Sequence, residues 1–247
     1  MEHTVPLVFA AAMGFSHAFE ADHLLAVSTI VTRRNSVWLA VKDGIAWGLG
    51  HSSTIFLIGM LLLLGKVAIS EQIFHYLEAV VGGMLMVLGL LRLRFLFRPG
   101  GGAPVHAHLR EVLFFRKKGL AAPAWVLQRP VGARPPAIEN LRLAAPADDH
   151  RLAYAVGLVH GLAGSGALVL LVMSRISGLG GAVSYLLIFG LGSIAGMLLA
   201  SGVFSLPFSK KVSANPRLQT GLSLLSSLLC VGYGAQVVFE NLISGVR

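Results

Sequence analysis

The sequence predicts an all-helical, polytopic membrane protein with six transmembrane helices built as a 3+3 inverted repeat. Composition is the first observation behind this fold class: of 247 residues, 55% are hydrophobic and only 13% are charged. Such a chain is too apolar for a soluble globular domain. The net charge of +9 would suit nucleic acid in a soluble protein. Here most basic residues lie between long apolar segments, so we expect the lipid bilayer, and no nucleic acid, as the partner.

The second observation is the length of the apolar segments. A spanning helix needs about 20 apolar residues, because the hydrocarbon core of a bilayer is about 30 Å thick. Six segments are long enough, and an open sheet could not satisfy its edges in lipid. We expect spans at Val5–Val31, Gly44–Leu64, Ile73–Leu91, Leu152–Ser174, Gly181–Leu206 and Leu218–Phe239.

The spans divide the chain into three regions. Residues 1–97 form the first three-helix unit, residues 98–150 a basic loop rich in proline and glycine, and residues 151–247 the second three-helix unit. Most of the lysine and arginine residues fall on the side of the membrane that holds the loop. The positive-inside rule therefore places residues 98–150 in the cytoplasm and both termini outside a cell (inner) membrane.

A match between the two halves is the third observation. Gly14-Phe15-Ser16-His17-Ala18 aligns with Gly157-Leu158-Val159-His160-Gly161, and Gly48-Leu49-Gly50-His51 aligns with Gly190-Leu191-Gly192-Ser193. Because three is odd, a second three-helix unit enters the membrane from the opposite side, which favours alternating access around a midplane site. Chance similarity between glycine-rich helices is the other explanation.

The first span carries four ionisable side chains within seven residues, namely His17, Glu20, Asp22 and His23. A carboxylate at the centre of a spanning helix costs about 2.5–3.5 kcal/mol on insertion scales. Protonation, histidine partners, water or a bound cation could offset that cost, and imidazole with carboxylate suits first-row divalent metals. An undistorted helix cannot bring His17, Asp22 and His23 onto one ion. Either the helix breaks here, or the groups serve two subsites along a path.

Other polar residues extend this hypothesis. We expect His51 of the second span to converge on the first. Ser52 and Ser53 beside it could hold the ligands in position or line the ion's path, a role also open to Glu20, His160 and Ser193. A structural hydrogen bond and a second-half site remain equally open for His160. His3 could capture Ni(II) or Cu(II) together with the amino terminus. We expect Lys42 and Asp43 at the cytoplasmic boundary, where they help to orient the protein in the membrane or form a local pair. His75 and Glu78 are expected at the membrane interface near the outer end of the third span.

At these residues the chain resembles the nickel/cobalt transporter superfamily, whose first-helix signature is a histidine, four residues, then Asp-His. His17 and Asp22-His23 match that signature, and Leu49-Gly50-His51-Ser52-Ser53 looks like its companion motif. The whole chain is similar to the UreH-like (NicO) branch. The resemblance implies a carrier that takes Ni²⁺ or Co²⁺ as substrate, with His17, Asp22, His23 and His51 at the ligand positions and no permanently bound cofactor. Such carriers often supply urease or hydrogenase maturation proteins.

The second half departs from the larger permeases of that superfamily. Its spans read Gly161-Leu162-Ala163-Gly164-Ser165-Gly166 and Gly192-Ser193-Ile194-Ala195-Gly196-Met197, with no carboxylate in either. The ligand set of the second half, and the choice between uptake and efflux, therefore stay open.

Several alternatives remain beside the carrier. An intramembrane serine protease would use Ser165, but the sixth span has no histidine to serve as its base. A metallohydrolase would need an open coordination position, with Glu20 as base. An anion or sulfite exporter would need cationic residues that line the middle of the bundle. A urease-associated nickel delivery protein would need a protein partner for its loop. We expect a carrier and no enzyme.

Overall fold

The computed structural model describes residues 4–32, 34, 36–65, 70–97, 150–162, 178–209 and 216–244. All regular structure in these residues is helical, so the all-helical prediction is confirmed for this part of the chain. His3, Ser165 and the predicted loop up to residue 149 lie outside the described residues.

Within the described residues, four helices are long and apolar enough to cross a membrane. They are α3 (Val37–Gly65), α4 (Glu71–Leu96), α10 (Leu179–Ser205) and α11 (Pro216–Phe239), and short helices η1 (Leu206–Phe208) and η2 (Glu240–Ser244) extend the last two. At 1.5 Å per residue, each exceeds the roughly 30 Å of hydrocarbon that a span must cross. Their outward faces remain apolar: Leu57, Leu61 and Leu64 of α3 are each about two-thirds exposed. Apolar side chains turned outward are what a lipid-facing helix requires.

The first predicted span, Val5–Val31, is not a single helix. It forms α1 (Thr4–His17) and α2 (Ala21–Val31), which meet at a turn. The amide groups of Phe19 and Glu20 donate to the carbonyls three residues before them, and the backbone of Glu20 is extended. The turn lets the chain change direction after His17. Of the two explanations that the sequence left open, a helix break is therefore present.

The fourth predicted span also differs from a continuous helix over Leu152–Ser174. The structure has α8 (Arg151–His160), which ends in a turn at Gly161 and Leu162, and residues 163–177 lie outside the described part. Like α1, α8 therefore ends at a histidine. A short apolar helix with free carbonyl groups at its end can accept hydrogen bonds or approach a cation there.

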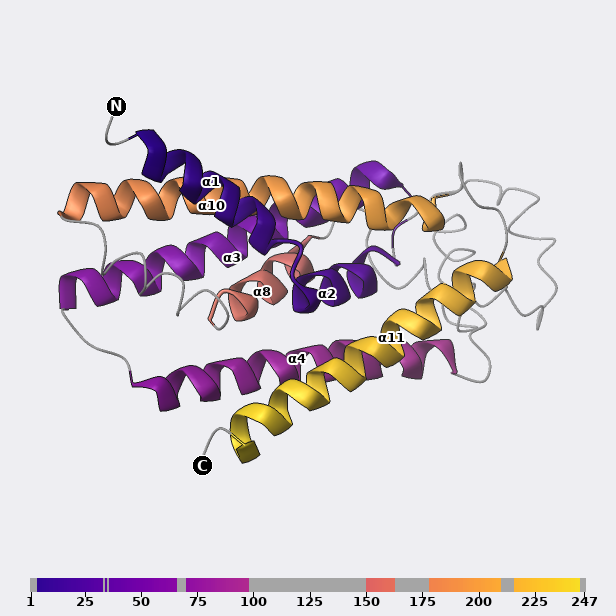
Figure 1. The fold of residues 1–247 in the computed structure, drawn as a ribbon. Helices are drawn as coiled ribbons and strands as arrows, with labels where there is room; N and C mark the ends of the chain where they lie inside the picture. The colour runs from indigo at the N-terminus through magenta and orange to yellow at the C-terminus, as the bar shows by residue number, and fades with distance from the viewer. Residues whose placement is uncertain are drawn as a thin grey trace, which may run out of the picture.

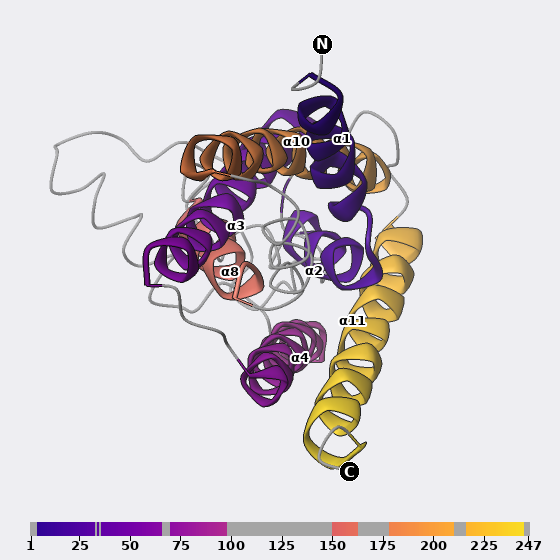
Figure 2. The same cartoon turned by 60° about the vertical axis from the view of Figure 1, so that its left-hand side comes forward.

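The two short helices α2 and α8 lie in the middle of the bundle (Figures 1 and 2). On one side of them α3 packs against α10, with α1 on α10 and α8 on α3; on the other side α4 packs against α11. The helices approach closely where glycines face a neighbour. A Cβ on Gly14 of α1 would overlap the backbone of Phe189 in α10, and a Cβ on Gly157 of α8 would overlap the backbone of Trp47 in α3. The hydrophobic effect does not drive helices together in lipid, so small residues at such positions stabilise the bundle by letting the helices pack closely.

Candidate metal-binding site

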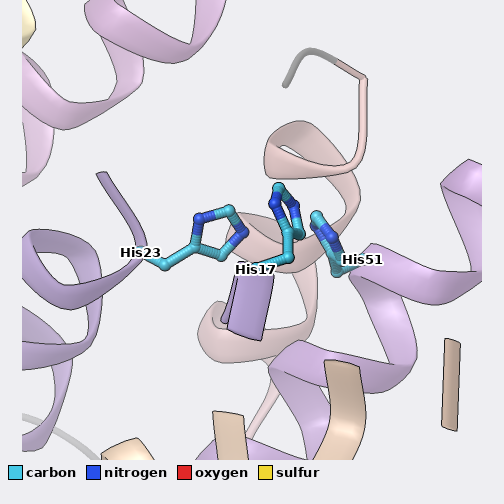
Figure 3. A group of neighbouring side chains, drawn as sticks. All are labelled: His17, His23 and His51. Atoms are coloured by element: carbon cyan, nitrogen blue, oxygen red, sulfur yellow. The ribbon is translucent and has the colours of Figure 1, made fainter. Parts of the chain in front are cut away.

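Three histidines from three helices converge in the centre of the molecule. His17 is the last residue of α1, His23 lies in the first turn of α2, and His51 lies in the middle of α3. All three are fully buried. Their ring centroids are 4.6 Å apart for His17 and His23, 5.3 Å for His17 and His51, and 5.1 Å for His23 and His51. One ring nitrogen of each lies within 4.8 Å of the others, and Figure 3 shows the three rings gathered together. The expected convergence of His51 on the first span is therefore present.

A fourth histidine joins the cluster from the second half of the chain. His160, the last residue of α8, is buried, and its ring centroid lies 4.3 Å from that of His23 and 6.4 Å from that of His51. The sequence pointed to His160 through its alignment with His17 but left its role open. Its position at the end of α8, against α3, brings it to the same centre.

Asp22 binds two of these histidines. One carboxylate oxygen, Oδ1, lies 2.9 Å from Nδ1 of His23 and accepts the His23 backbone N–H at 2.8 Å; the other, Oδ2, lies 3.0 Å from Nε2 of His160. Asp22, His23 and His160 thus form a second group with metal-ligand spacing. The four expected ligands do not form one group. Together with His160 they form two triads that share His23.

Several imidazole nitrogens in this cluster have no hydrogen-bond partner among the described residues. They are Nε2 of His17 and His23, Nδ1 of His160, and both ring nitrogens of His51. Leaving a buried polar group unsatisfied costs about 1–3 kcal/mol, so such groups call for an explanation. Unprotonated nitrogens that face one another in a buried cluster are suited to bind a cation.

Glu20 and two aromatic side chains border the histidines. The Glu20 carboxylate is half exposed, and its Oε1 lies 2.9 Å from Nδ1 of His17. Trp47 stacks on His23 with ring centroids 5.6 Å apart, and Phe189 lies 5.8 Å from His17. Sequence reasoning missed both aromatics, although each directly precedes one of the two aligned glycine motifs. Their apolar rings limit access of water to the nitrogens beside them.

The three expected serines, Ser52, Ser53 and Ser193, make no hydrogen bond to a histidine among the described residues. The hydroxyl of Ser52 donates to the carbonyl of Gly190 on α10 at 3.1 Å, and the hydroxyl of Ser53 is exposed and donates to Leu49 in its own helix. Ser193 is fully buried, and its hydroxyl has no partner among the described residues. Ser52 thus joins α3 to α10, and Ser53 faces away from the core.

A separate polar group joins α3 to the beginning of α8. Asp43 accepts hydrogen bonds from Nε and Nη2 of Arg34, and Nδ1 of His150 lies 2.6 Å from its Oδ1. Asp43 and Arg34 are both buried. Lys42 lies instead over the ring of Trp38. The pairing expected near Asp43 is therefore made by Arg34, which the sequence analysis did not single out.

Comparison with known proteins identifies two relatives of the chain. The chain is 31% identical over 204 residues to the urease accessory protein UreH of Bacillus sp. (strain TB-90), a match that covers 82% of this chain and 77% of UreH. It is 32% identical over 116 residues to the nickel transporter NicT of Mycobacterium tuberculosis, covering 41% of this chain but only 30% of NicT. No protein-family model and no solved structure matches the chain.

Neither relative is named as an enzyme, in agreement with the expectation from the sequence. The four long apolar helices agree with a multi-pass membrane protein. The extent of the match to UreH, together with the motifs that contain His17 and His51, decides the family. The chain belongs to the UreH-like branch of the nickel/cobalt transporter superfamily.

Proposed function

We propose that this protein carries a divalent first-row transition metal, Ni²⁺ before Co²⁺, across the membrane through the buried histidine cluster. The observation that carries the proposal is the convergence of His17, His23 and His51 from three helices, with unpartnered nitrogens facing one another. The name of NicT, a nickel transporter, supports the choice of metal. In this proposal His17, His23 and His51 are neutral nitrogen donors, and Asp22 is an oxygen donor that offsets part of the ion's charge.

The donor set argues for this class of cation. Mg²⁺ and Ca²⁺ prefer shells of oxygen ligands, whereas imidazole suits Ni²⁺, Co²⁺, Cu²⁺ and Zn²⁺. Asp22 supplies one negative charge, and its hydrogen bonds to two histidines fix the orientation of their rings. Such a partner fixes the tautomer of a ligating histidine and makes it more basic. A cluster of this kind binds a borderline metal and discriminates against the abundant hard cations.

The proposed architecture is a six-span inverted repeat, with residues 1–97 and 151–247 as its halves and residues 98–150 as the connecting loop. Reciprocal contacts support it. Gly14 of the first half faces Phe189 of the second, and their counterparts in the alignment, Gly157 and Trp47, face each other in the same way. Phe189 also contacts the His17 ring, as Trp47 contacts the His160 ring. Equivalent partners in exchanged halves are what a pseudo-twofold axis produces, and alternating access is the motion that such repeats favour.

The proposed topology places both termini outside and the loop in the cytoplasm. Figure 1 draws the beginning of α1 and the end of α11 at the same end of the bundle, which supports termini on one side. The choice of outside rests on the positive-inside rule. The urease link in the name of UreH supports a cytoplasmic recipient, such as urease or hydrogenase maturation proteins, for imported nickel. Efflux, or delivery through a protein contact, would use the same cluster.

Metal flux in proteoliposomes tests the proposal. Purified protein is reconstituted, and movement of Ni²⁺, Co²⁺ and Zn²⁺ in both directions is followed with and without an imposed proton gradient. We expect Ni²⁺ and Co²⁺ to cross faster than in protein-free vesicles, and Mg²⁺ to cross at the protein-free rate. Equal rates for all metals with and without protein would overturn the proposal.

A further inference from the structure

We infer that the cluster holds two alternative metal subsites that share His23, and that the ion moves between them by exchanging ligands. The first subsite is His17, His23 and His51. The second is Asp22, His23 and His160, and it brings in a ligand from the second half of the chain. The inference rests on the proposed function, because it describes how the transported ion passes through that cluster.

The spacing within the second group fits a metal ion. Two ligand atoms that each lie about 2.1 Å from a metal, at the right angle of an octahedral shell, are about 3.0 Å apart. The Asp22 carboxylate oxygens lie 2.9 Å from Nδ1 of His23 and 3.0 Å from Nε2 of His160. An ion could therefore replace the hydrogen bonds in this group with small movements of the side chains.

The ring of His23 separates the two subsites. Its Nδ1 faces Asp22 and thereby the second subsite. Its Nε2 has no partner among the residues that the structure describes, and in Figure 3 it points toward His17 and His51. A neutral imidazole carries a proton on one nitrogen and a free lone pair on the other. His23 can therefore ligate in only one subsite at a time, so the cluster holds one ion, in either of two places.

The two subsites differ in charge and in access. The ligands of the first are three imidazoles, with the half-exposed Glu20 carboxylate beside His17, whereas the second has the carboxylate of Asp22 as a ligand. The side chain of Asp22 is 19% exposed, against 1% for those of His23 and His160. The first subsite draws on α1, α2 and α3, and the second draws on α2 and α8. Transfer of the ion past His23 thus moves it from ligands of one half to ligands of both halves.

Substitution of His160 tests the inference. His160→Ala removes the ligand and its hydrogen bond to Asp22, whereas the amide of His160→Gln can still donate to Asp22 but is a poor ligand for Ni²⁺. His75→Gln serves as a control, because His75 lies in α4 and contacts Asn241 rather than the cluster. Equilibrium dialysis measures Ni²⁺ affinity and stoichiometry in detergent, and proteoliposomes measure flux.

We expect one Ni²⁺ per chain in the unmodified protein and in all three variants, with affinity within about threefold. Both His160 variants are expected to lose at least about tenfold in flux, while His75→Gln keeps it. Two ions per chain, or wild-type flux in His160→Ala, would overturn the inference. Recovery of flux in His160→Gln would also overturn it, because His160 would then act only by orienting Asp22. If the unmodified protein neither bound nor moved Ni²⁺, the proposed function itself would fail, which is a distinct result.

Discussion

Asp22 is the residue whose surroundings most constrain the cluster. Its two carboxylate oxygens are engaged by different histidines, and the backbone of His23 donates to one of them. This arrangement holds the His23 ring so that the remaining nitrogen faces His17 and His51. Asp22 thus links the position of α2, where it lies in the first turn, to the geometry of a site formed by four helices.

Asp22→Asn is expected to abolish Ni²⁺ flux, to below about one-tenth of wild type, without preventing insertion into the membrane. The asparagine amide has one acceptor oxygen where the carboxylate has two, so one histidine loses its hydrogen-bond acceptor. The amide also carries no negative charge to offset the charge of the metal ion. His17→Ala is expected to give the same loss through a missing ligand. Uptake of ⁶³Ni into proteoliposomes measures both, and normal flux in either variant would contradict the assigned roles.

The pH dependence of transport follows from the use of imidazole nitrogens. A protonated imidazole cannot bind a metal, and the ordinary pKa of histidine is about 6.5. Flux is therefore expected to be highest at neutral and slightly alkaline pH and to fall as the pH is lowered from 8 to 4. The measurement is initial ⁶³Ni uptake with equal pH on both sides of the vesicle. A flat profile would count against ligation by histidine.

Most residues of the cluster could be predicted individually from the sequence. Ionisable groups are costly in lipid, so His17, Asp22, His23 and His51 stand out within apolar segments. The role of His160 stayed open because a single histidine at a helix end suits a hydrogen bond as well as a metal. Arg34 could not be paired with Asp43 from the sequence, since their contact depends on how the chain turns between α2 and α3.

The turns at the ends of α1 and α8 place His17 and His160 at the cluster. In a regular helix Asp22 would point away from the face shared by His17 and His23. The extended backbone at Glu20 turns α2, so Asp22 and His23 meet α8 and α3 instead. Hydropathy predicted an apolar segment of the right length here but not its break, because a window average does not register three residues that leave the helix.

Close packing of α8 against α3 is expected to depend on Gly157. A Cβ at this position would lie 2.8 Å from Cδ1 of Trp47 and 3.0 Å from the backbone nitrogen of His51, too close for either to remain in place. Gly157→Ala is expected to destabilise the fold by about 1–3 kcal/mol, as overpacking does elsewhere. Thermal unfolding in detergent measures the effect.

Gly83 of α4 provides the matched control for this prediction. A Cβ there meets no atom within 4 Å, so Gly83→Ala is expected to leave the midpoint of unfolding unchanged or slightly raised, because alanine favours helix. Equal midpoints for the two variants would show that the approach of α8 to α3 has no energetic consequence.

For the molecule as a whole, the sequence predicted a helical membrane protein from composition and segment length. Four of the expected spans are long helices, because uninterrupted apolar segments leave the backbone no other way to satisfy its hydrogen bonds in lipid. The packing of α1 on α10, and of α8 on α3, required the structure, because helix contacts in lipid depend on the shapes of whole faces.

The orientation in the membrane can be measured with two cysteines at the ends of one helix. Ser70 lies at the beginning of α4 and Phe97 at its end, and both are exposed. In a Cys230→Ser background, which removes the one native cysteine, Ser70→Cys is expected to react with an impermeant maleimide on intact cells. Phe97→Cys is expected to react only after the cells are opened. The reverse pattern would place both termini inside.

His23→Ala gives the most direct test of the central claim, that buried imidazoles at the centre of the bundle carry the metal. His23 belongs to both triads, so its loss is expected to reduce ⁶³Ni flux in proteoliposomes to the rate of protein-free vesicles. His75→Ala, at equal protein density and with the same elution from a sizing column, is expected to retain wild-type flux. Wild-type flux in folded His23→Ala would contradict the account.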